Sequence, residues 1–234
     1  MNRTLFALCI LALSIGVAVG STFFIFNTNT SLTENTPLTS LIERMSPVTV
    51  SITGNIFEES GVTTRAGTGI IVWSHGTILT SKHLLSEWFS YIVTLHDGSQ
   101  FSAKLLKSHP SLDLALLSIT SKTPLSLPVG KFINSQANVA QWENVAAIGN
   151  MLGLYPWSVS TGIISGLNRT VSFSGITMNW LIQTTIPMNF GNSGGPLIAS
   201  NGKIIGINTG IVGGSSQIGW ALPLTQEEVD TFLK

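Results

Sequence analysis

The sequence predicts an all-β protein. Short apolar runs of strand length recur along most of the chain, and Gly, Ser, Asn and Asp, which favour turns, separate them. No long amphipathic helical pattern lies between Pro47 and Leu222. About 190 residues remain after the N-terminal segments, which is enough to enclose two small β cores. We therefore expect strands throughout this region, with short helices only near its two ends.

The first 26 residues form an apolar segment of their own. Arg3 places a positive charge before the apolar run, and residues 5–26 contain no charged side chain. A run of this length can span a bilayer, so we expect it to anchor the protein in the cytoplasmic membrane. A cleaved signal peptide is the alternative, with residues 18–20 as the small-residue cleavage site, although the apolar run continues to Phe26. In that case the protein would be secreted.

The basic residues predict which side of the membrane the rest of the chain occupies. Arg3 precedes the apolar segment and the next basic residue is Arg44. The positive-inside rule therefore places the chain after the apolar segment outside the cytoplasm, in the periplasm or on the outer face. Residues 27–36 are polar and rich in Thr and Asn, which indicates a linker. A short helix should follow Thr36, with Pro37 at the first helical position.

Residues 191–198 read Gly-Asn-Ser-Gly-Gly-Pro-Leu-Ile and carry the strongest chemical signal in the chain. Glycines on both sides of Ser193 allow a tight turn whose successive backbone N–H groups point toward one place, as the stabilisation of an oxyanion requires. Ser193 is therefore a candidate nucleophile. A serine hydroxyl is a weak nucleophile, so it needs a base, and the base needs an acid to orient it.

The chain has only three aspartates, and two of them have simple structural explanations. Asp97 lies in an Asp-Gly turn after an apolar strand, and Asp230 lies in a C-terminal helix that begins with a capping box at Thr225. Asp113 lies inside the apolar run 112–117, where a carboxylate is costly unless something pairs with it. Asp113 is therefore the candidate acid. The alternative is an acid at the rim, where a strand begins.

Three of the four histidines lie in sequences typical of loops: His75, His96 and His109. His83 differs because it follows the apolar run 77–80, which we expect to be a strand. A single histidine at the end of a strand is more often structural than catalytic. Together with Asp113 and Ser193, in the chain order His, Asp, Ser, it becomes the best candidate for the base.

Nine segments of the chain, in order, resemble the protease domain of the HtrA (Deg) serine proteases, which belong to the chymotrypsin-like superfamily. The segments are residues 67–71, 77–83, 113–117, 147–150, 161–165, 183–184, 191–198, 206–209 and 218–223. The resemblance implies two six-stranded antiparallel β-barrels. The first, within residues 37–125, would carry His83 and Asp113, and the second, within residues 126–234, would carry Ser193 and a terminal helix.

The resemblance also implies a serine endopeptidase that acts on unfolded or exposed segments of extracytoplasmic proteins. Ser193 would attack the peptide carbonyl, His83 would take its proton, and Asp113 would orient the imidazole. The turn of Gly191, Asn192 and Ser193 would form the oxyanion hole. In digestive trypsin-like enzymes, an aspartate at the position of Asn192 pairs with an N-terminus freed by cleavage. Because Asn192 is neutral, we expect no activation of that kind.

By the same resemblance, Met188, Gly210 and Ile211 would line the pocket for the side chain before the scissile bond. None of the three is charged. An apolar pocket favours small or medium aliphatic side chains and disfavours Lys or Arg, which would be buried without a counter-charge. For Met188 and Ile211, the alternative is packing in the protein core.

Composition excludes several other function classes. The formal net charge is zero and only 9% of the residues are charged, so we expect no nucleic-acid partner. Cys9 is the only cysteine, which leaves neither an intrachain disulfide nor a thiol nucleophile in the folded domain. No His and Cys cluster has metal-ligand spacing and no phosphate-binding glycine loop is present, so neither a metal nor a cofactor is expected.

Some features depart from the HtrA pattern. Thr185 stands where the family commonly has an acid, and Pro187 is an added proline close to the oxyanion turn. The chain ends soon after Pro223, so we expect no peptide-binding PDZ domain in it. Two other functions stay open: a catalytically silent chaperone or binding protein on the same fold, and an assembly partner of a PDZ-bearing protease. HtrA proteases are usually trimers, so a homotrimer is among the expected assemblies.

Overall fold

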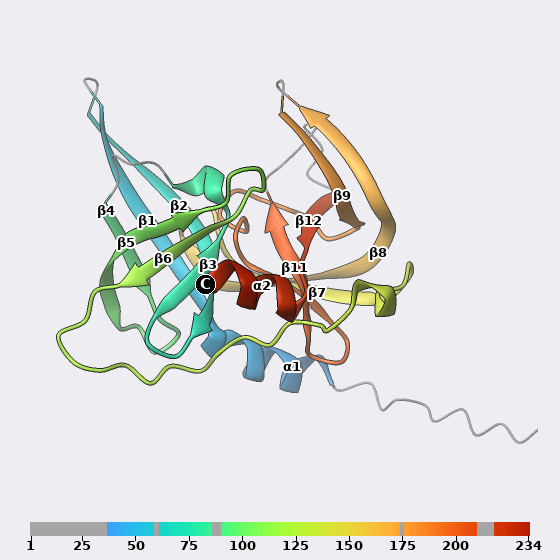
Figure 1. Ribbon diagram of the computed structural model, residues 1–234, viewed down its shortest axis with the longest axis horizontal. Helices are drawn as coiled ribbons and strands as arrows, with labels where there is room; N and C mark the ends of the chain where they lie inside the picture. The colour runs from blue at the N-terminus through green and yellow to red at the C-terminus, as the bar shows by residue number, and fades with distance from the viewer. Residues whose placement is uncertain (1–36, 59–60, 86–89, 174–175, 210–217) are drawn as a thin grey trace, which may run out of the picture. The chain divides into compact units, whose positions relative to one another are not determined.

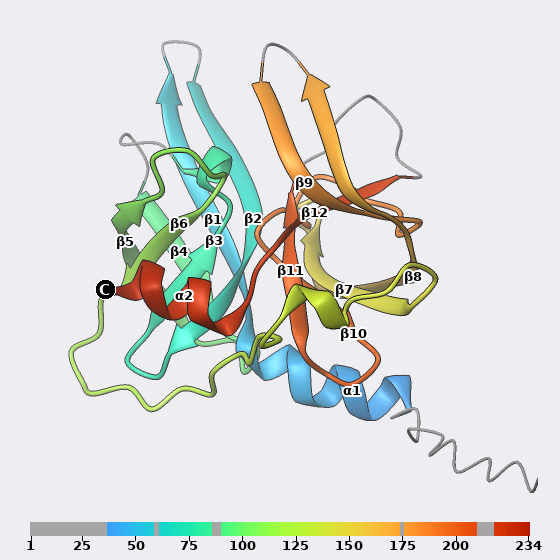
Figure 2. The same ribbon diagram turned by 45° about the vertical axis from the view of Figure 1, so that its right-hand side comes forward.

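The computed structural model describes residues 37–58, 61–85, 90–173, 176–209 and 218–234. Within these ranges, twelve antiparallel strands form two closed barrels, in the orders β1-β2-β3-β6-β5-β4 and β10-β11-β12-β9-β8-β7 (Figures 1 and 2). The predicted fold of two six-stranded antiparallel barrels is confirmed. The predicted membrane segment, residues 5–26, and the predicted linker, residues 27–36, lie outside the described residues.

The first barrel contains β1 (Thr49–Glu58), β2 (Gly61–Trp73), β3 (Thr77–Thr80), β4 (Ser90–Thr94), β5 (Gln100–Ser108) and β6 (Ala115–Ile119). Two of its tight turns use a glycine in the left-handed region. Gly76 (φ 97°) follows His75 between β2 and β3, and Gly98 (φ 86°) follows Asp97 between β4 and β5. Glycine adopts this conformation without steric cost, which is why these short polar sequences can reverse the chain.

The second barrel contains β7 (Asn144–Met151), β8 (Tyr155–Phe173), β9 (Ile176–Thr184), β10 (Pro196–Ala199), β11 (Ile204–Thr209) and β12 (Gly219–Pro223). Strand β8 is 19 residues long, and its first part pairs with β7. Its second part, residues 164–173, pairs with β9 through several register shifts, as β-bulges produce. Bulges bend a strand, and Figure 2 shows β8 curving around the barrel. The β6–β7 connection, residues 120–143, includes the 3-10 helix η3 (Gln136–Asn138) and the predicted division at residues 125 and 126.

Apolar residues occur in runs because several strands are buried on both faces. Side chains alternate along a strand, so neighbours such as Ile70 and Ile71 in β2 point in opposite directions. Ile71 belongs to the core of the first barrel, whereas Ile70 belongs to a core that both barrels share. The shared core also contains Ile148 of β7 and Phe232 near the C-terminus. This packing joins the two barrels.

The N-terminal helix α1 (Leu38–Met45) begins one position later than predicted. Pro37 is its N-cap, with an extended ψ of 137°, rather than its first helical residue. The chain continues into the 3-10 helix η1 (Ser46–Val48) before β1. No helix in the described ranges is long and apolar enough to cross a membrane.

The C-terminal helix α2 (Gln226–Leu233) begins with the predicted capping box. The Thr225 hydroxyl accepts a hydrogen bond from the N–H of Glu228 at 3.3 Å, and the Glu228 carboxylate accepts one from the N–H of Thr225 at 2.7 Å. The buried residues Val229 and Phe232 attach the helix to the shared core.

The Thr225→Ala substitution is expected to lower the free energy of unfolding by about 1 kcal/mol, because the first turn of α2 loses its cap. Urea unfolding curves measure the change. The matched control is Thr231→Ala at an exposed position of the same helix. The control should keep or slightly raise stability, because Ala favours helix more than Thr does. Equal stability of Thr225→Ala and the wild-type protein would contradict the capping role.

Candidate active site

His83 and Asp113 come from adjacent ends of two paired strands. β3 ends at Thr80 and pairs in antiparallel fashion with β6, which begins at Ala115. The residues that follow β3 and those that precede β6 therefore meet at one edge of the first barrel. His83 lies there in the 3-10 helix η2 (Lys82–Leu84).

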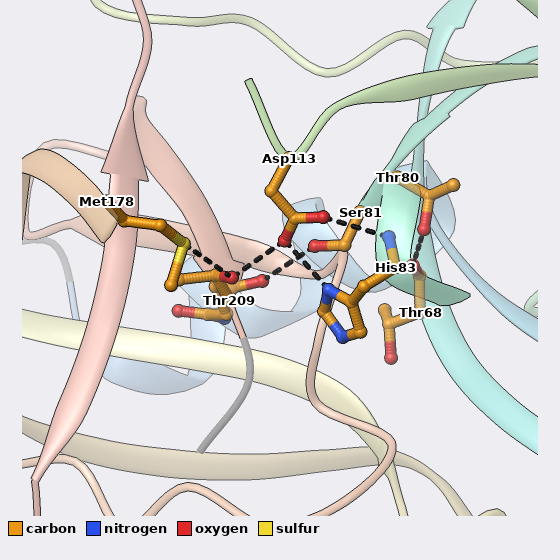
Figure 3. A network of polar contacts seen from close by, with 8 residues as sticks. Thr68, Thr80, Ser81, His83, Asp113, Met178 and Thr209 are labelled. Atoms are coloured by element: carbon orange, nitrogen blue, oxygen red, sulfur yellow. Dashed lines mark hydrogen bonds and ion pairs between the residues drawn. The ribbon is translucent and has the colours of Figure 1, made fainter. Parts of the chain in front are cut away.

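The carboxylate of Asp113 holds His83 through both of its oxygens (Figure 3). His83 Nδ1 lies 2.8 Å from Asp113 Oδ2, and the backbone N–H of His83 donates to Asp113 Oδ1 at 2.9 Å. The side chain of Asp113 is 15% exposed and that of His83 is 44% exposed. When Nδ1 carries its proton toward the carboxylate, Nε2 is the ring nitrogen that can accept another proton. The pair therefore has the geometry of a buried acid that orients a more exposed base.

Asp113 lies before strand β6, not within a strand as the apolar run 112–117 predicted. The physical reason is a local turn around His109, whose Nδ1 accepts hydrogen bonds from the N–H groups of Ser111 and Leu112 at 3.2 and 2.9 Å. The backbone of Asp113 thus has the position of the rim alternative. Its carboxylate nevertheless has the partner that the cost of burial requires.

Thr209 is a further member of this cluster that sequence analysis did not identify. It is the last residue of β11, and its hydroxyl donates to Asp113 Oδ2 at 2.8 Å across the two barrels (Figure 3). Burial alone would raise the pKa of Asp113. The hydrogen bonds from His83 and Thr209, with the charge of His83, outweigh burial and hold this pKa below its ordinary value. The carboxylate is therefore ionised at neutral pH.

In the Thr209→Val protein, ionisation of Asp113 should contribute less to the free energy of unfolding than it does in the wild type. In the unfolded chain the pKa of an aspartate is about 3.9. When folding lowers this pKa, the ionised carboxylate stabilises the folded protein at pH values above the unfolded pKa. This stabilisation is lost as the pH falls through the folded pKa. Removing the hydroxyl should raise the pKa of Asp113 and lower the free energy of unfolding at pH 7 by about 1.5–3 kcal/mol. Urea unfolding at pH 7 and pH 3 should show a deficit that shrinks in acid. An equal deficit at both pH values would contradict this role.

Ser193 lies in the turn before β10 and is 7% exposed. It lines a cleft of about 510 Å³ together with His83. The other lining residues come from β2, from η2, from the β7–β8 turn and from the segment before Ser193: Thr64, Arg65, Ala66, Leu84, Leu152, Gly153, Asn189, Phe190 and Gly191. Among the described residues, no hydrogen bond joins the Ser193 hydroxyl to His83, although both residues line the same cleft. Such contacts are often long before substrate binds.

Two glycines allow the serine turn to lie close to neighbouring backbone. Gly191 has a φ of 94° and Gly194 a φ of 85°, both in the left-handed region. A Cβ atom on Gly191 would collide with the carbonyl oxygen of Asn150, and one on Gly194 would collide with the carbonyl oxygen of Thr68. Both the backbone conformation and the close approach therefore require glycine.

The same turn leaves two backbone N–H groups without an acceptor in the described part of the chain. The carbonyl of Phe190 accepts a hydrogen bond from Leu152 N–H at 2.7 Å, and that of Asn192 accepts one from Gly195 N–H at 3.1 Å. In a trans peptide the N–H points away from the carbonyl, so Gly191 N–H and Ser193 N–H are directed away from these contacts. Neither N–H group donates a hydrogen bond to another described residue. An oxyanion hole needs two such donors.

The predicted pocket residues are only partly described. Met188 is 3% exposed and belongs to the core of the second barrel, and it does not line the cleft that contains Ser193. This position favours the core-packing alternative for Met188. The side chain of Asn192 is also buried, with its Nδ2 4.0 Å from Met188 Sδ. Gly210 and Ile211 lie outside the described residues.

Comparisons with known proteins identify the family of the chain. Residues 67–207 match the trypsin-like peptidase domain family. The magnetosome formation protease MamE of Paramagnetospirillum magneticum is 40% identical over 166 residues, which are 68% of this chain and 22% of that protein. A probable periplasmic serine endoprotease, DegP-like, of Chlamydia muridarum is 40% identical over 161 residues, 67% of this chain and 31% of that protein. The chain thus spans between a fifth and a third of these relatives.

Solved structures give the same assignment. A variant of the HtrA-type protease AlgW with a tripeptide superposes with a TM-score of 0.69 at 31% identity, over 80% of this chain and 60% of that one. AlgW with a decapeptide also superposes with a TM-score of 0.69, at 28% identity, over 85% and 67% of the two chains. From the double barrel, the matched segment and these relatives, the chain belongs to the trypsin-like peptidase family and contains a protease domain of the HtrA type.

Proposed function

We propose that this protein is a serine endopeptidase that cleaves unfolded or exposed segments of extracytoplasmic proteins. The observation that carries the proposal is the paired contact of Asp113 with His83, at the edge of a cleft that also contains Ser193. In this arrangement an ionised acid orients a base beside a hydroxyl nucleophile, which is the set of groups that peptide hydrolysis by a serine requires.

In the first half of the reaction, Ser193 becomes acylated. His83 Nε2 takes the hydroxyl proton while Ser193 Oγ bonds to the peptide carbonyl carbon, and the carbonyl oxygen becomes an oxyanion. The N–H groups of Gly191 and Ser193, which have no other acceptor among the described residues, would donate to that oxyanion. His83 then gives its proton to the leaving amine as the C–N bond breaks.

In the second half, water takes the place of the amine. His83 removes a proton from the water, which attacks the acyl carbon, and the proton returns to Ser193 Oγ as the acyl bond breaks. Asp113 stays ionised throughout and stabilises the imidazolium that forms in each half. Thr209 supports this role because its hydrogen bond favours the charged carboxylate.

The substrate class is inferred from the cleft and from the relatives. Phe190 and Leu152 line the cleft and are 77% and 53% exposed, so they offer apolar surface to a bound chain. Folded proteins bury most such partners, whereas unfolded chains expose them. The AlgW structures contain a tripeptide and a decapeptide, which supports an extended peptide as substrate here. The preference for a small or medium aliphatic side chain before the scissile bond stays a prediction.

The proposed location rests on the relatives and on the N-terminal sequence. The Chlamydia muridarum relative is described as periplasmic, and residues 5–26 are long and apolar enough to span a bilayer. We propose that the protease domain acts outside the cytoplasm. Anchoring by residues 5–26, and assembly as a homotrimer, stay predictions.

The proposal is tested with one substrate protein in two states. The purified protein is incubated with the substrate either folded or held unfolded by reduction of its disulfides, and the fragments are identified by mass spectrometry. We expect cleavage of the unfolded state only, mainly after Val, Ala or Leu. Binding of the unfolded substrate without any fragments would instead support a catalytically silent chaperone. Cleavage mainly after Lys or Arg would contradict the apolar pocket.

A further inference from the structure

We propose that Thr68 is a positioning residue that holds the oxyanion turn from the opposite barrel. The inference rests on the proposed function and adds a residue to its machinery. Thr68 lies in β2 of the first barrel and is 1% exposed. Its N–H donates to the carbonyl of Ser193 at 2.9 Å, and its hydroxyl donates to the carbonyl of Gly191 at 2.7 Å. The hydroxyl also accepts a hydrogen bond from Asn150 N–H at 2.8 Å.

The Gly191 carbonyl belongs to the peptide that joins the two proposed oxyanion donors. The preceding peptide is held by Leu152 and the following one by Gly195, so three successive carbonyls of the turn each have a donor. Without the Thr68 hydroxyl, the middle carbonyl would keep only Asn150 N–H, at 3.3 Å. Gly191 has no Cβ to restrict rotation about its backbone bonds. The orientation of the peptides on either side of Gly191 therefore depends strongly on these hydrogen bonds. Loss of the hydroxyl should therefore loosen the Gly191–Asn192 peptide and, through it, disturb the orientation of the two N–H groups on either side of it.

Thr68 is itself fixed by buried contacts on its own barrel. The Thr80 hydroxyl of β3 donates to the Thr68 carbonyl at 2.6 Å, and Ser51 of β1 lies opposite Thr68 in the strand pairing (Figure 3 shows Thr68 and Thr80). The Ser51 hydroxyl accepts a hydrogen bond from Asn150 Nδ2 at 2.7 Å, which ties the end of β7 to the same place. The residues of this network are at most 6% exposed, so its hydrogen bonds have little competition from solvent. The first barrel thus positions the oxyanion turn as well as carrying His83 and Asp113.

A purely structural role for Thr68 would reduce stability but leave turnover per folded molecule unchanged. The test therefore measures kcat and KM on one peptide substrate for Thr68→Val, which keeps the shape and removes the hydroxyl, and for Thr68→Ser, which keeps the hydroxyl. The control is Thr49→Val, because Thr49 is also 1% exposed and its hydroxyl donates to the carbonyl of Met45 at 2.9 Å, away from the cleft.

We expect Thr68→Val to lower kcat by about 10- to 100-fold, somewhat less than the loss of a complete oxyanion donor. KM should stay within about twofold, because the effect falls on the transition state. Thr68→Ser should recover kcat to within about threefold, and Thr49→Val should leave kcat unchanged. If Thr68→Val does not fold, Thr68→Cys gives the same comparison with a weak donor. An unchanged kcat for the hydroxyl-free variant, or an equal loss in Thr49→Val, would overturn the inference.

A second measurement does not depend on proteolysis. In nuclear magnetic resonance spectra of protein with labelled glycine, the amide signal of Gly191 is compared between wild type, Thr68→Val and Thr49→Val, each also carrying Ser193→Ala. We expect Gly191 to shift only in Thr68→Val, and an unshifted signal would overturn the inference. If the wild-type protein cleaves no peptide, the proposed function fails, and this amide comparison still decides whether Thr68 holds the turn.

Discussion

The Ser193→Ala protein is expected to lose peptide cleavage by a factor of about 10⁶ in kcat, as occurs when the nucleophile of a serine-protease triad is removed. Ser193 is the only hydroxyl residue between Gly191 and Gly194, so the turn itself keeps no other nucleophile. The fold should be unaffected. Among the described residues the Ser193 hydroxyl makes no hydrogen bond, so its removal leaves no buried donor or acceptor without a partner.

The measurement compares cleavage of an unfolded protein by the wild type, by Ser193→Ala and by Ser165→Ala. Ser165 is the matched control because its hydroxyl is buried in the second barrel without a hydrogen-bond partner among the described residues, yet it does not line the cleft. Ser165→Ala should cleave at the wild-type rate, and thermal unfolding should show all three proteins folded. Equal turnover by Ser193→Ala and the wild type would remove Ser193 from the mechanism.

The Asp113→Asn protein is expected to lose a factor of about 10⁴ in kcat while remaining folded. An asparagine side chain has nearly the same shape as aspartate and can occupy the same place, but it carries no charge to stabilise the imidazolium of His83. Its NH₂ group also donates, which would favour the tautomer of His83 that carries its proton on Nε2 and cannot accept one from Ser193.

Steady-state cleavage of a peptide substrate measures this effect, with Asp97→Asn as the matched control. Asp97 lies in an exposed turn, where its carboxylate accepts a hydrogen bond from Ser99 N–H at 2.9 Å, and asparagine can accept the same bond. The control should therefore retain wild-type activity. A loss of less than tenfold in Asp113→Asn would show that the contact with His83 has no part in catalysis.

The pairing of Asp113 with His83 could be predicted from the sequence because aspartate and histidine are rare in it. With three aspartates and four histidines, local patterns explained all but Asp113 and His83. The structure places both near the ends of strands β3 and β6, which pair directly. The apolar run 112–117 suggested that Asp113 lies within a strand, but β6 begins only at Ala115. The turn around His109 delays its start, and apolar composition alone does not reveal such a turn.

Thr209 and Thr68 could not be found in this way. Thr209 is 96 residues from Asp113 in the chain, and Thr68 is 123 residues from Gly191, so no local pattern connects the partners. Threonine is also common in β-strands for its shape alone, so its presence carries little information about function. Met188 shows the reverse case: an apolar residue near the serine was compatible with a pocket, but it packs in the core of the second barrel.

The central claim is that His83 activates Ser193 for covalent attack. The most direct measurement is the mass of the intact protein after reaction with an organophosphorus fluoride, followed by mapping of the modified peptide. The account predicts one adduct per chain on Ser193, none in Ser193→Ala, and a rate of modification at least about 10²-fold lower in His83→Ala. Failure to modify Ser193 in the folded wild-type protein, or an equal rate in His83→Ala, would contradict the account.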